Sequence, residues 1–227
     1  IADAFRRAGL SRSLPLFGDR QILWPPVDVE LTPPPRVLAV SPRDEIRLLR
    51  TVLLSPNLTR EQVAAMEAAI ERDDRFSALV DRVGGLAAYP SIVIDTRSYA
   101  STVQTVAHEW VHHYLFFYPL GFAFWDSNDL RTINETVADL VAQEIAPLVF
   151  AANPDVRLPA PSPRDRNESD AILNRLRLDV DALLAAGNVA EAEALMEETR
   201  LRLIDLDRPF RRINQAFFAF NGVYGTR

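Results

Sequence analysis

The sequence predicts a mainly α, mixed α+β fold, and three observations support this. Apolar side chains recur at the three- and four-residue spacing of amphipathic helices over most of the segment between residues 101 and 206. One short segment, residues 91–95, instead has the composition of a strand. With 227 residues, 48% of them hydrophobic, the chain is long enough for one substantial core. We therefore expect a single, mainly helical domain with a small β element.

The N-terminal segment is expected to be an extended arm. Residues 1–40 contain six prolines, all before residue 36. Proline fixes its own φ angle and donates no backbone hydrogen bond, so this composition favours an extended chain that wraps the body. The end of the arm, residues 36–40, is predicted to form a short strand.

Two helices are predicted next. They cover residues 41–54 and residues 59–83, and the second has Thr59 as its N-cap and Gln62 at the capping-box position. A Gly-Gly pair follows and is expected to end the second helix.

The middle of the chain is predicted to hold a strand followed by two longer helices. The strand is the segment 91–95, introduced by a proline. The first helix is expected to begin at Ser101 as N-cap and to end at Pro119 and Gly121. The second helix is predicted over residues 130–146.

The C-terminal part is predicted to be a helical hairpin that packs on the core. Residues 151–164 contain four prolines and are expected to be a linker, so the C-terminal helices occupy residues 165–227. Within them, residues 170–206 carry two apolar stripes separated by Gly187-Asn188, as expected for an antiparallel hairpin. A last aromatic helix is predicted over residues 210–220.

Two short motifs predict a metal site, His-Glu-Trp-Val-His from His108 and Asn-Glu-Thr-Val-Ala-Asp from Asn134. On a helix, residues four apart share one face about 5 to 6 Å apart, so His108 and His112 can direct two imidazoles at one ion. Glu109 lies beside them, within reach of a water molecule on that ion. A catalytic zinc takes three protein ligands and keeps a fourth position open, and Glu135 on the following helix is the natural third ligand.

This pair of motifs resembles the gluzincin metallopeptidases, the thermolysin-like superfamily, whose signature is HExxH followed by NExxxD on a second helix. The resemblance implies that His108, His112 and Glu135 bind Zn²⁺ and that Glu109 is the general base. It also implies that Asp139 accepts a hydrogen bond from a ligand histidine.

The resemblance covers residues 90–146 and implies a helical zincin-like core. We expect the metal-binding catalytic core to occupy residues 41–150. Both motif helices are rich in apolar residues, which predicts that they are buried. Buried imidazoles and carboxylates cost several kcal/mol unless they are paired or bound to a metal.

Other interpretations of the motifs remain open from the residues alone. One is a buried His/Glu/Asp hydrogen-bond network without a metal, and another is a non-haem Fe(II) site, which also uses two histidines and a carboxylate. A di-iron bundle needs a second Glu-x-x-His motif, and the only three histidines are residues 108, 112 and 113. His113 lies about 100° from the metal-facing side of its helix and is expected to be a packing or surface residue.

Composition and charge restrict the partners. A net charge of −6 and a pI near 5.2 argue against nucleic acid. The absence of cysteine excludes disulfides and thiolate metal sites. The chain begins with Ile1, which is expected to follow removal of a signal peptide or membrane anchor, or to be an artificial start. Removal of such a segment would be consistent with an extracytoplasmic or membrane-anchored protein. The most apolar run, residues 114–125, is too short to span a bilayer.

The expected function is that of a zinc peptidase acting on a peptide or protein substrate. The strand 91–95 is expected either to be an edge strand that aligns substrate by main-chain pairing or to be an ordinary core strand. The family's oxyanion-stabilising histidine has no counterpart downstream, so Tyr224 is the candidate for that role, followed by Arg131. The alternative function is a catalytically idle scaffold that binds partners through the hairpin 170–206.

Overall fold

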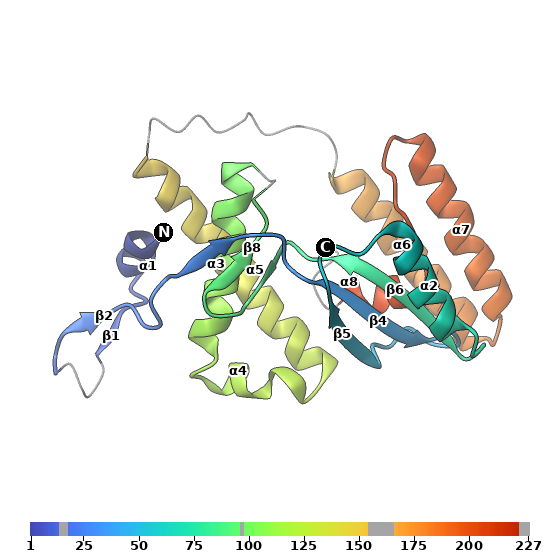
Figure 1. Ribbon diagram of the computed structural model, residues 1–227, viewed down its shortest axis with the longest axis horizontal. Coiled ribbons are helices and arrows are strands. Elements are labelled where there is room, and N and C mark those ends of the chain that lie inside the picture. The colour runs from blue at the N-terminus through green and yellow to red at the C-terminus, as the bar shows by residue number, and fades with distance from the viewer. Residues whose placement is uncertain (14–17, 96–97, 154–165, 223–227) are drawn as a thin grey trace. The chain divides into compact units, whose positions relative to one another are not determined.

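A computed structural model describes residues 1–13, 18–95, 98–153 and 166–222, with the side chains of 166–168 excepted (Figure 1). The fold is mainly helical with small sheets, which confirms the predicted α+β class. The chain divides into two compact units. The first combines residues 1–34 with 83–160, and the second combines residues 35–82 with 161–227.

The first unit is built on two packed helices, α3 (Tyr99–Leu115) and α5 (Asn128–Ala151). Their shared core includes Val103, Ala107, Trp110 and Val111 from α3 and Ala138, Ala142, Ile145, Ala146 and Val149 from α5. The alanines on α5 leave room for the larger α3 side chains, so the two helices can approach closely.

The N-terminal segment completes this core and is not simply extended. Its first turn is a helix, α1 (Ala2–Arg7), and the ring of Phe5 lies 3.9 Å from that of Trp110. The indole nitrogen of Trp110 donates a 2.9 Å hydrogen bond to the carbonyl of Pro25. The buried indole therefore has the polar partner that it needs. Strands β1 (Arg12–Ser13) and β2 (Gln21–Ile22) form a short antiparallel pair.

A three-stranded sheet precedes helix α3 in the chain. Its order is β3 (Val29–Leu31), β8 (Ser91–Val93) and β7 (Gly85–Leu86). The predicted strand at residues 91–95 is present as β8; of its two alternatives, the core strand is confirmed and the edge strand is wrong. β8 pairs with β3 on one side and with β7 on the other, so its own hydrogen-bonding groups are occupied. The edge next to the helix belongs to β7.

The ends of the two long helices differ from the prediction. The N-cap of α3 is Ser98, whose side chain accepts a hydrogen bond from the amide of Ser101, so the prediction of Ser101 as cap is wrong by one turn. Helix α3 ends at Leu115, and Pro119 begins another short helix, α4 (Pro119–Phe122). A 3-10 turn, η2 (Ala123–Trp125), then leads to α5, which Ser127 caps.

The second unit contains an antiparallel sheet with β4 (Arg36–Pro42) between β5 (Arg50–Leu54) and β6 (Phe76–Arg82). The predicted strand at 36–40 is confirmed, whereas the predicted helix at 41–54 is wrong. The helix predicted over 59–83 is confirmed only in its first half, α2 (Arg60–Glu71), with the capping box of Thr59 and Gln62 in place. Its second half is strand β6, because residues 77–80 are buried beside β4.

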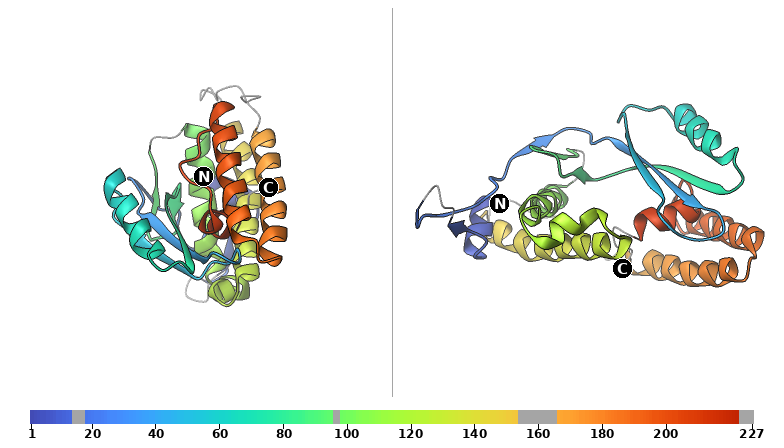
Figure 2. Two further views of the ribbon diagram at one scale, coloured as in Figure 1. Left: turned by 90° about the vertical axis from the view of Figure 1, so that its right-hand side faces the viewer. Right: turned by 90° about the horizontal axis from the view of Figure 1, so that it is seen from below.

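The helical hairpin of the second unit is confirmed as α6 (Arg166–Ala185) and α7 (Val189–Asp205), which lie side by side (Figure 2). Gly187 turns the chain with a φ of 80°, an angle that favours glycine. The last helix is shorter than predicted, α8 (Gln215–Asn221), and it packs on β4 and β6.

The unit boundaries therefore differ from the expected single domain with a core at 41–150. Residues 35–82 group with the C-terminal helices, and the helices that carry the two motifs, α3 and α5, group with the N-terminal arm. The hairpin 170–206 shares its core with Leu79 of β6 and with α8. None of the described helices is both long and apolar enough to cross a membrane.

Candidate metal centre

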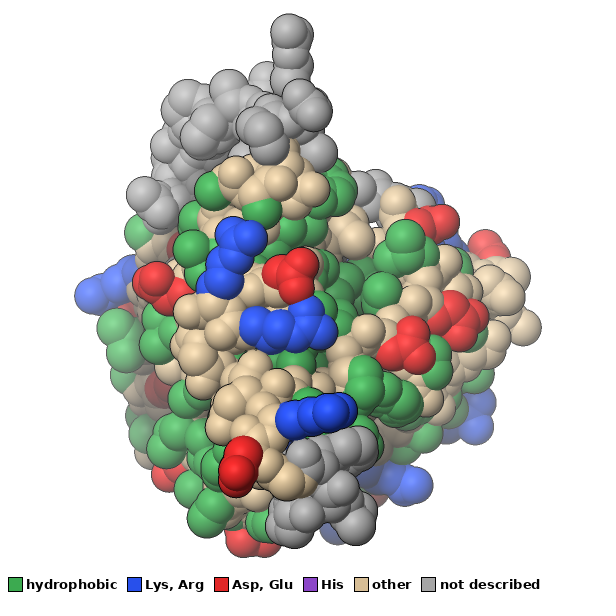
Figure 3. All heavy atoms as spheres, turned by 90° about the vertical axis from the view of Figure 1, so that its left-hand side faces the viewer, with side chains coloured by type: hydrophobic (Ala, Val, Ile, Leu, Met, Phe, Trp, Pro, Cys, Tyr) green, Lys and Arg blue, Asp and Glu red, His purple; other side chains and the backbone are tan. Residues whose placement is uncertain are grey.

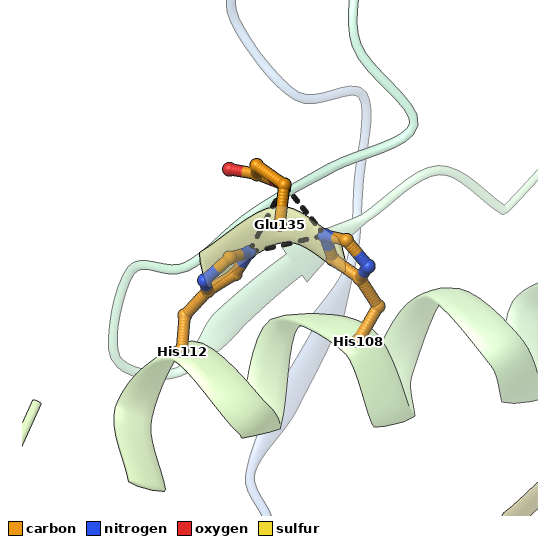
Figure 4. Close-up of side chains that lie close together, drawn as sticks. All are labelled: His108, His112 and Glu135. Carbon is orange, nitrogen blue, oxygen red and sulfur yellow. Dashed lines mark hydrogen bonds and ion pairs between the residues drawn. The ribbon is translucent and has the colours of Figure 1, made fainter. Parts of the chain in front are cut away.

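Three of the predicted residues converge on one point between α3 and α5 (Figure 4). The Nε2 atoms of His108 and His112 lie 3.0 Å apart. The Oε2 atom of Glu135 lies 3.2 Å from the first nitrogen and 3.5 Å from the second. Ligand atoms of a tetrahedral zinc, each about 2.05 Å from the ion, are about 3.3 Å from one another. The three atoms thus have the mutual spacing of a metal's ligands.

The outer nitrogen of each imidazole is held by a polar partner on α5. His108 Nδ1 lies 2.9 Å from Asp139 Oδ1, and His112 Nδ1 lies 2.8 Å from Asn134 Oδ1. The amide nitrogen of Asn134 donates to the carbonyl of Leu120, so its oxygen faces the imidazole as an acceptor. Both Nδ1 atoms are therefore donors, which leaves both Nε2 lone pairs free for a metal.

This arrangement is electrostatically unfavourable without a cation. Glu135 is 3% exposed, and its Oε2 atom is buried without a hydrogen-bond partner among the described residues. Two imidazole lone pairs and a carboxylate oxygen would face one another at 3.0 to 3.5 Å. Such buried groups are destabilising unless a proton or a metal ion lies between them. His108, His112 and Glu135 form a group that could hold a metal ion.

The charges around the site also favour a cation at its centre. Burial lowers the pKa of His108, but hydrogen bonding to Asp139 and Glu135 outweighs it and raises that pKa to about 10. Burial raises the pKa of Glu135, but the two imidazoles 3.2 and 3.5 Å from its Oε2 atom hold the pKa below its ordinary value. The pocket therefore favours positive charge at its centre, which a metal cation would supply in place of a proton.

Glu109 lies on α3 beside the ligands, with its carboxylate packed against the backbone of Gly85 in β7. Glu109 is 7% exposed, and this burial raises its pKa. A methyl group on Gly85 would lie 2.9 Å from Cδ of Glu109 and 2.8 Å from Cγ2 of Thr105. The strand can therefore cover this carboxylate only because residue 85 has no side chain.

The remaining predicted residues lie outside the cluster. His113 contacts the ring of Tyr89 edge-on, and burial lowers its pKa, in agreement with a packing role. Tyr114 faces Tyr118, whose hydroxyl donates to it over 3.0 Å. The guanidinium of Arg131 stacks on Phe124 and Trp125 at 5.5 and 5.1 Å. Tyr224 lies outside the described residues, so its predicted role as oxyanion donor stays a prediction.

Two residues of the site were not assigned a role from the sequence. Asn134 is the first residue of the second motif and directly precedes Glu135. It lies on the buried side of α5 and is 1% exposed. Gly85 was taken only as a helix stop. The expected burial of both helices was too broad, because Phe116, Phe117, Ile133 and Leu140 are at least 42% exposed.

Comparison with known proteins adds no relative. No protein-family model, curated protein or solved structure matches the chain. Inferences about function therefore depend on the site itself.

Proposed function

We propose that this protein is a zinc-dependent hydrolase, most specifically a peptidase, with His108, His112 and Glu135 as metal ligands and Glu109 as general base. The observation that carries the proposal is that the Nε2 atoms of both histidines converge with a buried carboxylate oxygen of Glu135. The Nδ1 atoms of both histidines already have polar partners on α5. Without a proton or a cation between them, these three atoms would be acceptors facing one another.

The donor set suits zinc with a catalytic function. Two imidazoles and one carboxylate leave the fourth tetrahedral position for a ligand from solution. The same donors suit Fe(II), but a buried carboxylate beside the first histidine is useful for activating water and has no evident use in an oxygenase. Glu109 therefore supports hydrolysis.

Zinc in this site would polarise a substrate carbonyl and make water more acidic. Glu109 accepts a proton from the attacking water and delivers it to the leaving amine. Burial raises the pKa of Glu109, which brings its proton affinity closer to what a base needs near neutral pH. Gly85 keeps the carboxylate in place by lying directly against it.

Substrate alignment is assigned to β7, because β8 is paired on both sides. β7 pairs with β8 on one side and has no strand on its other side among the described residues. Its residue Gly85 lies against Glu109. An extended peptide that adds to this edge would pass next to the general base, and main-chain pairing would need no particular side chain.

The test couples metal analysis with a peptide-library cleavage assay on the parent protein and on Glu109→Gln. We expect one zinc per chain in both proteins and cleavage by the parent alone, with a loss of at least about 100-fold in the variant. Cleavage at the parent rate by Glu109→Gln would exclude the mechanism. A parent protein that binds zinc but cleaves no peptide would favour the scaffold function.

A further inference from the structure

Four aromatic side chains at the corner between α3, α4 and η2 are exposed and form what we call the aromatic ridge. Phe116, Phe117, Phe122 and Trp125 are 61%, 42%, 67% and 72% exposed. The ring of Phe116 contacts those of Phe117 and Phe122, at 5.4 and 5.9 Å. At roughly 150 to 250 Å² per aromatic side chain, the ridge exposes on the order of 400 to 600 Å², as much as the largest patch of a typical monomer.

The backbone of the ridge is internally hydrogen-bonded. The amide of Tyr118 donates to Leu115, and the amides of Gly121 and Phe122 donate to Tyr118, at 2.8 to 3.1 Å. A methyl group on Gly121 would lie 2.6 Å from the amide nitrogen of Phe116, so glycine allows α4 to fold tightly against the end of α3. The rings are thus presented in a fixed arrangement, and these amide groups need no water.

Two arginines stack on the aromatic side chains of this corner. Arg12 lies 4.9 Å from the ring of Phe117, and Arg131 lies 5.1 Å from that of Trp125. Each has a buried Nε atom without a hydrogen-bond partner, and neither forms an ion pair among the described residues. Figure 3 shows one face of the molecule, on which arginine side chains lie beside acidic, hydrophobic and other groups. Cations without acidic partners beside exposed aromatic rings complement a surface that is both apolar and anionic.

We propose that the aromatic ridge is a membrane-docking surface that inserts into the headgroup region of an anionic phospholipid bilayer. The uncharged segment 115–125 is about half the length needed to span a bilayer, so it would lie in the interface. Tryptophan and arginine both suit this depth, because each has an apolar part and a polar end. The net charge of −6 opposes binding to anionic lipid, so insertion of the rings must supply most of the affinity.

Vesicle flotation of the full chain tests the proposal, with phosphatidylcholine vesicles and with vesicles that also contain phosphatidylglycerol. The test variant is Phe122→Ser with Trp125→Ser. The matched control is Leu178→Ser with Leu201→Ser, which removes two apolar side chains that are 65% and 50% exposed on α6 and α7. We expect the parent and the control to float with the mixed vesicles and the ridge variant to partition at least tenfold less.

Two further measurements keep the result interpretable if the double variant folds poorly. Brominated lipids should quench the fluorescence of the parent, and Trp125→Phe should lose most of that quenching, since Trp110 is buried and the half-buried Trp24 is not part of the ridge. Replacing both arginines by glutamine should remove the preference for phosphatidylglycerol. Glu109→Gln should float like the parent, so the outcome is independent of catalysis.

Three results would overturn the proposal. The first is a parent protein that stays in the aqueous fraction with both kinds of vesicle. The second is a ridge variant that floats as well as the parent. The third is a ridge variant that converts a dimer into a monomer without any change in vesicle binding, which would make a second copy of the chain the partner of the ridge.

Discussion

Replacing Gly85 by alanine should disable the proposed base while leaving the metal ligands untouched. The new methyl group would lie 2.9 Å from Cδ of Glu109 and 2.8 Å from Cγ2 of Thr105. Ordinary contacts between carbon atoms are about 3.5 to 4.0 Å, so the carboxylate must move by about 0.6 Å or more. A displacement approaching 1 Å at a reacting group costs about 100-fold in rate, and overpacking of this kind costs about 1 to 3 kcal/mol in stability.

The assay compares zinc content, kcat/KM and thermal unfolding of the parent and of Gly85→Ala. We expect unchanged zinc, a loss of about 100-fold in kcat/KM and a lower melting temperature. Gly187→Ala is the matched control, because Gly187 has a φ of 80° and no neighbour within 4 Å of an added methyl group. Backbone strain alone should lower the free energy of unfolding of Gly187→Ala by about 1 to 2 kcal/mol, and this variant should keep full activity.

A second variant separates the two neighbours of the new methyl group. Adding Thr105→Ser to Gly85→Ala removes the clash with Cγ2 but keeps a hydroxyl that can donate to Ser101, as Thr105 does over 2.9 Å. We expect partial recovery of stability and no recovery of rate, because the clash with Glu109 remains. Parent-like turnover by zinc-loaded Gly85→Ala would refute the role given to this contact.

Three further outcomes follow from the same geometry. His112→Ala should bind no stoichiometric zinc by elemental analysis, and full occupancy in that variant would remove His112 from the ligand set. Asp139→Ala and Asn134→Ala should each weaken zinc affinity about 10 to 100-fold in a chelator competition, because each frees one imidazole to change tautomer; parent-like affinity in both would contradict this. Zinc at 100 times its Kd should stabilise the folded protein by about 2.7 kcal/mol, or roughly 5 to 11 °C in calorimetry, and His112→Ala should abolish this shift.

The candidate metal ligands could be predicted because their placement within each helix depends on local geometry. Helical periodicity puts His108 and His112 on one face, and the same four-residue step puts Glu135 and Asp139 on one face of α5. Packing of the two helices through their apolar faces then brings the four side chains together. The sequence therefore contained most of the site.

The sheets could not be predicted in the same way. Residues 41–54 and 72–83 have spacings that allow a helix. The strands within them, β5 and β6, depend on pairing with β4, and the partners in β4 and β6 are 34 to 46 positions apart. The order of the sheet around β8 likewise depends on residues 29–31, which are about 60 positions away in the sequence. A motif fixes side chains within a turn of helix, but it does not specify which strand lies at an edge.

The position of Gly85 depends both on the local sequence and on long-range strand pairing. Its sequence context, a Gly-Gly pair after an apolar stretch, equally suits the end of a helix. The pairing of Gly85 with Val93 places Gly85 over Glu109. The buried carboxylate of Glu109 explains why residue 85 has no side chain, because a Cβ atom would clash with it. Glu109, the proposed general base, is thus held from two directions, by the helix that carries it and by a strand that belongs to neither motif. For this reason Gly85→Ala tests the tertiary arrangement of the site, whereas substitutions of the ligands test only the motif.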